Sequence, residues 1–375
     1  MSIAQLGGSG VRLDQAFNPK LNALNAVRLT LAVSVIAWHS FPITGAPRPA
    51  SFVTQLLGEG GVDGFFAISG FLIVSSWMRR PRWWPYLKAR FLRIVPAFWV
   101  CLIATALLLA PLGITLAHQP FPDSYLGDAL TYVTHNAGLR ITEVGIGSTP
   151  TGVPYPGVWN GSLWTLWWEF LCYLGVLALG LTRLLKFRAT IPLIFALCLV
   201  GVIVTDVGVT NNFYLVNGSR FGLMFAAGAL VYQFKHWLPV NWWLVACSLV
   251  VVALTAMLPD YRIFAAIPLA YALIGVGALI KIRRLRLQND VSYGTYIYAF
   301  PVQQVLASAG LAVIGVPLFA VVATVITLLL ATGSWFAIEK PAMRLRNAQW
   351  GSRAVARTPE YLAIPTRDAP PPLGE

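Results

Sequence analysis

The first long apolar run of the chain reads LNALNAVRLTLAVSVIAWHSF from residue 21 to residue 41. It holds one arginine, Arg28, and one histidine, His39, among mainly apolar residues. A helix needs about 20 consecutive, mainly apolar residues to cross the hydrocarbon core of a bilayer. The run therefore predicts a membrane-spanning helix that carries two ionisable side chains.

Similar apolar runs recur along nearly the whole chain. The composition agrees with membrane burial, since 57% of the 375 residues are hydrophobic and 11% are charged, against about a quarter charged in ordinary soluble domains. Windows of about 20 residues predict spans at 21–41, 62–78, 94–115, 162–181, 191–209, 213–234, 242–258, 263–280, 291–314 and 316–338. We expect an all-α, polytopic membrane bundle of about ten transmembrane helices, in one domain of residues 21–346.

Three segments lie outside these runs. Residues 1–20 are polar and lack the pattern of a cleaved signal peptide, so they are predicted to be a cytoplasmic N-terminal segment. Residues 347–375 are polar and rich in proline, which predicts a disordered cytoplasmic tail. Residues 116–161 form a long connection rich in Pro, Gly, Asn and Thr, of a kind that often has a function or serves as a lid.

The basic residues give an orientation. Most of the 27 Lys and Arg residues fall on the cytoplasmic side if the N-terminus is cytoplasmic, and the opposite insertion inverts this bias. We therefore expect a multi-pass protein of the bacterial inner membrane with both termini in the cytoplasm. A net charge of +13 is also typical of proteins that bind nucleic acid, but no soluble basic face is present and no nucleic acid partner is expected.

The four cysteines lie inside apolar runs without a CxxC pair or a neighbouring histidine. Such cysteines are typical of small buried apolar residues. The sequence predicts neither a disulfide nor a metal site.

Arg28 and His39 fall on nearly the same face of the first helix, since they are eleven residues apart, or about 16 Å along the axis. An ionisable side chain inside a span costs about 2.5–3.5 kcal/mol or more, which favours the bundle interior or a wet cavity. Two plainer interpretations stay open. His39 can be a core histidine satisfied by a neighbour, and Arg28 can extend to the lipid headgroups.

A second pair, Arg90 and Arg93, lies in YLKARFLRIVP at the cytoplasmic start of the third span. Guanidinium groups bind phosphate oxygens through two parallel hydrogen bonds, and coenzyme A carries a pyrophosphate and a 3′-phosphate on the cytoplasmic side. The pair is therefore a candidate site for acyl-CoA. The alternative is ordinary positive charge on the inner side of the membrane.

Two acidic residues complete the candidates. Glu169 lies among tryptophans in SLWTLWWEFLCYL, where an unpaired carboxylate is costly, so we expect an arginine or histidine partner. Glu339 follows the last apolar run and precedes Lys340 and Pro341. Its alternative is a solvated surface charge.

With these residues in place, the chain resembles the acyltransferase 3 family, whose multi-span members O-acylate bacterial surface saccharides and some secondary metabolites. Six pieces in the family's order carry the resemblance: Arg28 with His39, GVDGFFAISGFLI at 61–73, Arg90-x-x-Arg93 before IVP, SLWTLWWEF at 162–170, VSYGTYIYAFP at 291–301 and IEKP at 338–341. The resemblance implies that His39 is the essential histidine, Arg28 its companion, and Arg90 and Arg93 part of the acyl-CoA site. Glu169 and Glu339 match the family's acidic residues. Many members carry a histidine where this chain has Ala299, which puts a mechanism with two histidines in doubt here.

The implied reaction moves an acyl group, acetyl by default, from acyl-CoA to a hydroxyl of a cell-envelope or exported saccharide, such as an exopolysaccharide repeat on a lipid carrier. No permanently bound cofactor is expected, and the partners are acyl-CoA, the saccharide or lipid-linked glycan, and the bilayer. His39 can act as the general base or carry the acyl group covalently. The alternative from another class is a secondary transporter or exporter of a saccharide or organic anion. A membrane scaffold is a further alternative.

Overall fold

A computed structural model describes residues 11–345 of the chain, and that part is helical without a β-strand. The predicted tail at 347–375 and half of the predicted segment 1–20 lie outside the described residues. In chain order the elements are α1 (Leu13–Ala16), α2 (Leu24–Ile43), α3 (Ser51–Val53), η2 (Thr54–Glu59), α4 (Gly60–Arg79), α5 (Trp83–Ala104), η3 (Thr105–Leu109), α6 (Ala110–Leu116), α7 (Tyr125–Asn136), α8 (Thr165–Leu181), η4 (Leu184–Lys186), α9 (Thr190–Asp206), α10 (Phe213–Phe234), α11 (Trp242–Thr255), α12 (Arg262–Leu279), η5 (Arg283–Leu285), α13 (Ser292–Ser308), η6 (Leu311–Ile314), α14 (Val316–Ser334), η7 (Trp335–Glu339) and α15 (Lys340–Arg344).

The predicted all-α class is confirmed, and every predicted span overlaps a helix. Within the described residues, five helical runs are long and apolar enough to cross a membrane: Leu24–Ile43, Ser51–Arg79, Trp83–Leu116, Arg262–Leu279 and Val316–Arg344. Three further apolar helices, α8, α9 and α11, are shorter. The expected number of about ten spans therefore stays a prediction.

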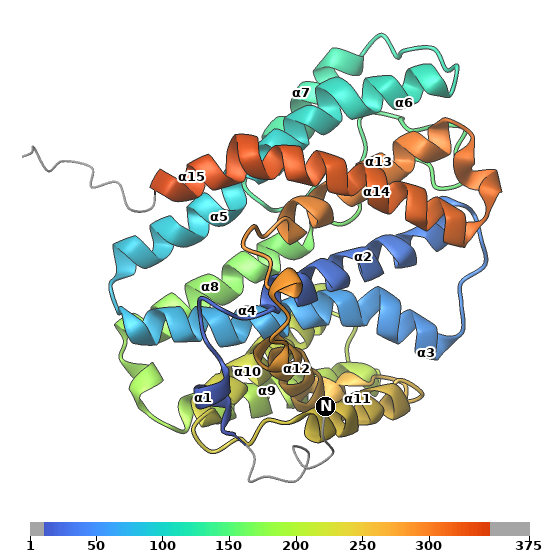
Figure 1. Ribbon diagram of the computed structural model, residues 1–375. Coiled ribbons are helices and arrows are strands. Elements are labelled where there is room, and N and C mark those ends of the chain that lie inside the picture. The colour runs from blue at the N-terminus through green and yellow to red at the C-terminus, as the bar shows by residue number, and fades with distance from the viewer. Residues whose placement is uncertain (1–10, 346–375) are drawn as a thin grey trace, which may run out of the picture.

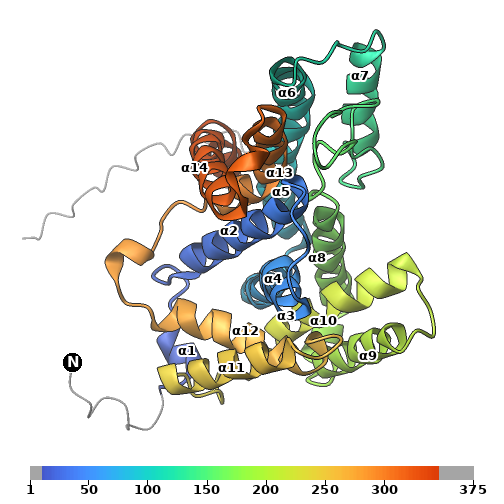
Figure 2. The same ribbon diagram turned by 90° about the vertical axis from the view of Figure 1, so that its right-hand side faces the viewer.

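Helices α2 and α4 form the centre of the bundle (Figures 1 and 2). α2 packs against α4 and α12 on one side and against α13 and α14 on the other. α4 packs against α8, α10 and α12 as well as α2. Side chains on α2 and α4 therefore face neighbours from most of the bundle.

The tightest helix crossing joins α4 to α10 through two glycines. A Cβ atom on Gly70 would lie 1.9 Å from the carbonyl oxygen of Phe225, and one on Gly228 would lie 1.8 Å from that of Ala67. Neither position can hold a larger side chain unless the backbones move apart. Small residues that let two backbones approach are typical of helix packing in membranes.

The bundle has two chemically different ends. We call the end where α2, α5 and α13 begin the basic end, because the turns there carry Arg79–Arg82, Arg183–Arg188 and Lys281–Arg286. We call the opposite end, where residues 117–164 connect α6 to α8, the loop end. This long connection, predicted only as a loop or lid, contains helix α7, whose Tyr125 hydroxyl donates to the carbonyl oxygen of Ala106 at 2.7 Å.

Large apolar side chains cover much of the outer surface. Leu329 on α14 is 70% exposed, and Leu107 and Leu108 in η3 are 62% and 60% exposed. A water-facing surface rarely carries so many contiguous apolar side chains. The surface fits contact with lipid.

Candidate active site

The candidate site forms at the basic end, where a single carboxylate joins two helices. The Oδ2 atom of Asp290, just before α13, accepts hydrogen bonds from the guanidinium of Arg28 on α2 and, at 2.6 Å, from Nη2 of Arg93 on α5. Its Oδ1 atom accepts from the backbone N–H of Ser292 at 3.3 Å and from the Ser292 hydroxyl at 2.5 Å. All four bonds hold Asp290 in place, so it fixes the relative positions of Arg28 and Arg93.

Asp290 was not among the residues predicted from the sequence. The predicted span began at Val291, so the carboxylate fell just outside the motif that starts there. The signal was present, because Asp290 is an acidic residue between a basic cluster, Lys281–Arg286, and an apolar run. Burial raises the pKa of Asp290, but the neighbouring Arg28 and Arg93 outweigh that effect and hold the pKa below its usual range.

Glu339 joins this group from the C-terminal end of the bundle. Its Oε2 atom accepts from Nη1 of Arg93 at 3.3 Å, and its side chain is 2% exposed. Glu339 ends η7, a π-helical turn that also presents Trp335, over whose ring the Arg93 guanidinium lies at 5.7 Å. The alternative of a solvated surface charge is wrong for Glu339, because the carboxylate is buried against an arginine.

Arg28 and Arg93 are likewise not simple surface charges. Their side chains are 16% and 15% exposed and both are ion-paired. The Arg28 guanidinium also lies 5.7 Å from the centre of the Phe65 ring on α4. Arg28 therefore points into the bundle and does not extend to the headgroups.

A cavity of about 100 Å³ opens beside these groups. Three guanidinium-bearing residues, Arg28, Arg90 and Arg93, line it together with Glu169 and Tyr293. Arg90 packs over the rings of Tyr86 and Tyr173 at 5.8 and 6.0 Å and donates to the Ser76 hydroxyl at 3.4 Å. The structure thus brings Arg90 and Arg93, the pair predicted to bind acyl-CoA, together with Arg28 and Glu169 around one space; the binding role of the pair stays a prediction.

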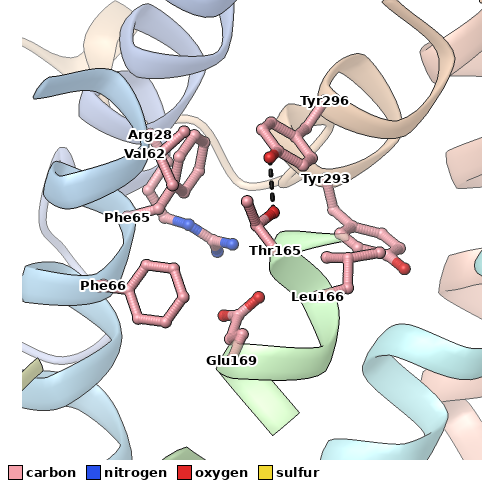
Figure 3. A pocket seen from close by; sticks show the side chains of 9 residues that line it. All are labelled: Arg28, Val62, Phe65, Phe66, Thr165, Leu166, Glu169, Tyr293 and Tyr296. Atoms are coloured by element: carbon pink, nitrogen blue, oxygen red, sulfur yellow. Dashed lines mark hydrogen bonds between the residues drawn. The ribbon is translucent and has the colours of Figure 1, made fainter. Parts of the chain in front are cut away.

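A second, smaller cavity of about 30 Å³ shares Arg28, Glu169 and Tyr293 with the first. Figure 3 shows the Arg28 guanidinium and the Glu169 carboxylate pointing into it from opposite sides. Val62 on α4 and Tyr296 on α13 line the second cavity. Each lies nearer the loop end than the residues of the same helix that line the first cavity, such as Ile68 on α4 and Tyr293 on α13. The two cavities therefore follow one another from the basic end toward the middle of the bundle.

Glu169 has partners other than those predicted. Its Oε1 atom accepts from the Ser69 hydroxyl at 2.9 Å and from the Tyr173 hydroxyl at 2.5 Å. In residues 11–345 no arginine or histidine forms an ion pair with it, so the expected charged partner is wrong. Arg28 shares the cavity with Glu169 without forming that pair.

His39 lies apart from this group, in the last turns of α2. Its ring packs edge-on against Phe300 of α13, with ring centres 5.1 Å apart, and its Nδ1 atom is buried without a hydrogen-bond partner in the described part of the chain. His39 thus faces the bundle interior, although it is not among the residues that line either cavity. Phe300 is one helical turn, about 6 Å, beyond Tyr296 at the end of the second cavity. Ala299 is buried beside it.

A separate charged group lies nearer the loop end around Asp63 of α4. Its Oδ2 atom accepts from the Tyr261 hydroxyl at 2.7 Å and from Nε of Arg262 at 2.6 Å, and its Oδ1 atom accepts from Nε of Arg220 at 3.2 Å. Arg262 also pairs with Glu59 and, at 3.0 Å, with Asp260. We call these residues the Asp63 cluster, and Arg28, Arg93, Asp290 and Glu339 the Asp290 cluster.

Comparisons with known proteins point in one direction. A family described as an acyltransferase domain matches residues 21–336. The chain is 29% identical over 297 residues to an O-acetyl transferase of Shigella phage Sf6, which covers 76% of this chain and 86% of that protein. It is 28% identical over 358 residues to nodulation protein 10 of Rhizobium leguminosarum bv. viciae, covering 87% and 94%. It is 30% identical over 309 residues to the exopolysaccharide production protein ExoZ of Rhizobium meliloti (strain 1021), covering 78% and 92%. No solved structure matches the chain.

Proposed function

The chain belongs to the acyltransferase domain family that matches residues 21–336, and is therefore an acyltransferase; from that premise we propose that it is a membrane-bound O-acyltransferase. It moves an acyl group, acetyl by default, from acyl-CoA to a hydroxyl of a cell-envelope or exported saccharide. The names of the phage O-acetyl transferase and of ExoZ support the acetyl group and the saccharide acceptor. The transporter alternative loses its support because the family is one of acyltransferases.

One observation carries the donor side of the proposal: three arginines of α2 and α5 line a single cavity at the basic end. Arg90 and Arg93 bind the phosphates of acyl-CoA there. In the described structure Arg93 is neutralised by Asp290 and Glu339, so phosphate oxygens exchange with these carboxylates as the donor enters. A charge-assisted bidentate bond to phosphate supplies the energy for that exchange.

The two successive cavities give the thioester arm its direction. The arm runs from Arg93 past Arg28 and Glu169 toward Tyr296, through space that both cavities line. His39 lies one helical turn of α13 further on, against Phe300. The side chains of Tyr296 and Phe300 must move for the thioester to reach the imidazole.

The chemistry then needs one proton acceptor. His39 takes the proton of the acceptor hydroxyl, the hydroxyl oxygen attacks the thioester carbonyl, and the carbon–sulfur bond breaks to give the ester and the coenzyme A thiolate. The imidazolium returns the proton to that thiolate. Arg28 and Glu169 line the path of the thioester, and Arg28 stabilises negative charge that develops on its carbonyl oxygen. The alternative is transfer through an acyl-histidine: the imidazole nitrogen attacks the thioester carbonyl as the carbon–sulfur bond breaks, and the acceptor hydroxyl oxygen then attacks the same carbonyl as the carbon–nitrogen bond breaks.

The membrane location belongs to the same proposal. Five long apolar helices and the exposed leucines support it, and the positive-inside rule places the basic end in the cytoplasm, where acyl-CoA is made. With about ten spans in the bacterial inner membrane, both termini are cytoplasmic and His39 lies toward the outer face. The saccharide then reaches His39 from the loop end.

The test is acyl transfer by the chain itself. Membranes that contain the full chain are incubated with labelled acetyl-CoA and a lipid-linked or exported saccharide of the source organism. Release of the free thiol that depends on both the chain and the saccharide, with the label in the glycan, supports the proposal. Thiol release without glycan labelling, or transport of saccharide without thiol release, contradicts it.

A further inference from the structure

A larger pocket at the basic end lies apart from both cavities of the candidate active site. It encloses about 300 Å³ between the end of α4, the turn that joins α8 to α9, and the end of α10. Its lining combines apolar side chains, among them Val74, Met78 and Ile191, with the basic side chains of Lys186, Arg188, Lys235 and His236. It shares no residue with the two cavities that Arg28 lines.

The three cations lack carboxylate partners. None of Lys186, Arg188 and Lys235 forms an ion pair with an acidic side chain in residues 11–345. Asp14, which lines a neighbouring pocket together with Lys235, is bonded to His236 at 2.7 Å. Aromatic rings hold two of them instead: Lys235 lies 4.1 Å from the centre of the Tyr232 ring, and Arg188 lies 5.9 Å from that of Trp237. Three unneutralised cations around one pocket favour an anion.

Gln233 adds a hydrogen-bond acceptor to the pocket. Its Nε2 atom donates to the carbonyl oxygen of Arg188 at 2.7 Å, which ties the α8–α9 turn to α10. Its Oε1 atom is buried and has no partner among the described residues. A buried carbonyl oxygen without a partner costs free energy, and a hydroxyl group of a ligand would satisfy it.

The surroundings of the pocket are amphipathic. Phe187 and Met78 at its rim are 65% and 49% exposed, and Lys186 also lines a neighbouring pocket with Trp83 and Trp84. Exposed tryptophans beside basic residues at the ends of apolar helices are typical of the membrane interface. The ligand therefore has an anionic, hydroxyl-bearing head and an apolar part that lies along the bundle.

We propose that this pocket binds the headgroup of an anionic glycerophospholipid. The phosphate lies among Lys186, Arg188 and Lys235, a headgroup hydroxyl donates to Oε1 of Gln233, and the acyl chains pass Met78, Phe187 and Ile191. Basic pockets between helices on the cytoplasmic side are known sites for such headgroups. This inference rests on the membrane location in the proposed function but not on the acyl-transfer reaction.

The test measures lipid binding by the purified full chain in detergent, by native mass spectrometry, with phosphatidylglycerol and phosphatidylcholine as probes. The triple variant K186Q/R188Q/K235Q should bind phosphatidylglycerol about tenfold more weakly or worse, with phosphatidylcholine unchanged. The matched control R80Q/R283Q/R284Q removes three exposed basic residues at the same end that line none of these pockets. It should bind phosphatidylglycerol as the unchanged chain does.

A second variant, Gln233→Leu, tests the hydroxyl contact. It should reduce the preference for phosphatidylglycerol over phosphatidic acid, which has no headgroup hydroxyl beyond its phosphate.

The proposal is contradicted if the triple variant K186Q/R188Q/K235Q binds phosphatidylglycerol as tightly as the unchanged chain does. It is also contradicted if the control variant R80Q/R283Q/R284Q loses as much phosphatidylglycerol binding as the triple variant. Competition of coenzyme A with phosphatidylglycerol for this pocket also overturns it, since the pocket then serves the donor. Binding needs no turnover, so a chain that fails as an acyltransferase is still informative.

Discussion

The Asp290 cluster and the Asp63 cluster are built from the same parts, a carboxylate between two arginines from different helices. Asp63 is fully buried, and both of its oxygens are bonded to Arg220, Arg262 and the Tyr261 hydroxyl. Asp290 is 12% exposed, and its arginines border a cavity. In the Asp290 cluster Glu339 also keeps one oxygen, Oε1, buried without a partner in the described residues.

The two clusters differ in whether a cavity borders them, and this determines what their buried charges can do. A closed cluster stabilises helix positions, because removing one partner leaves a buried charge uncompensated. A cluster beside a cavity can exchange its internal partners for a ligand. We therefore propose that the Asp63 cluster serves stability and that the Asp290 cluster serves donor binding.

The largest effect is expected from His39, which belongs to neither cluster. His39→Ala should lower the rate of acyl transfer by about 10² to 10⁴, because a general base contributes roughly that factor. Labelled acetyl transfer in membranes measures the rate. The control is His135→Ala, since His135 is exposed in α7. If His39→Ala transfers acetyl at the rate of the unchanged chain, His39 is not the general base.

The next largest effect is on stability. Asp63→Ala should cost about 3–5 kcal/mol of unfolding free energy, the range for breaking a buried ion pair, since it removes the fully buried carboxylate that joins Arg262 to the partly exposed Arg220. Thermal unfolding of the purified chain in detergent measures the loss, with Asp206→Ala at the exposed end of α9 as control. If Asp63→Ala unfolds at the same temperature as the control, this cluster does not hold the helices.

The pH dependence sharpens the same contrast. Arg28 and Arg93 overcome the effect of burial and hold the pKa of Asp290 below its usual range, so ionised Asp290 stabilises the fold above the unfolded pKa of about 3.9. That stabilisation is lost as the pH falls through the lower, folded pKa. The difference in unfolding temperature between the unchanged chain and Asp290→Asn should therefore be full near neutral pH and shrink in acid. A difference that grows in acid contradicts the sign.

The smallest effect is expected from Tyr261→Phe, which removes one hydroxyl from the Asp63 cluster. It should cost about 1 kcal/mol, typical of one buried hydrogen bond, because Arg220 and Arg262 still neutralise Asp63. Thermal unfolding of the purified Tyr261→Phe variant measures this loss, and the KM for the acyl donor is measured in parallel. A raised donor KM at unchanged stability would mean that the Asp63 cluster takes part in donor binding, which contradicts its proposed role in stability.

Much of the helical framework is predictable from the sequence, because long apolar runs are local. The predicted run at 213–234 coincides with α10, and the run at 21–41 with most of α2. The start of α5 at Trp83 was missed by eleven residues, because Arg82 to Arg93 lower the hydropathy of a segment that is nevertheless helical. Helix α7 was missed because its apolar face is short and lies within a loop of turn residues.

The sequence led to most of the side chains that the structure brings together but not to their partners, and the catalytic roles of these residues stay predictions. The motifs led to six residues, and the structure places four of them, Arg28, Arg90, Arg93 and Glu169, around one cavity. Glu339 pairs with Arg93, while His39 lies apart against Phe300. Asp290 lies 262 positions from Arg28, and such a pair depends on how α2, α5 and α13 pack. The hydroxyl partners of Glu169 are tertiary contacts of the same kind. Local patterns carry no information on them.

The most direct test of the central claim compares two matched arginines, one from each cluster. The KM for acetyl-CoA is measured for Arg93→Gln and Arg220→Gln, with rates expressed per folded molecule. If Arg93 binds a donor phosphate, KM should rise about tenfold or more for Arg93→Gln, because a bidentate phosphate contact is lost. It should change less than about twofold for Arg220→Gln. Equal KM values in the two variants would contradict this binding role of Arg93.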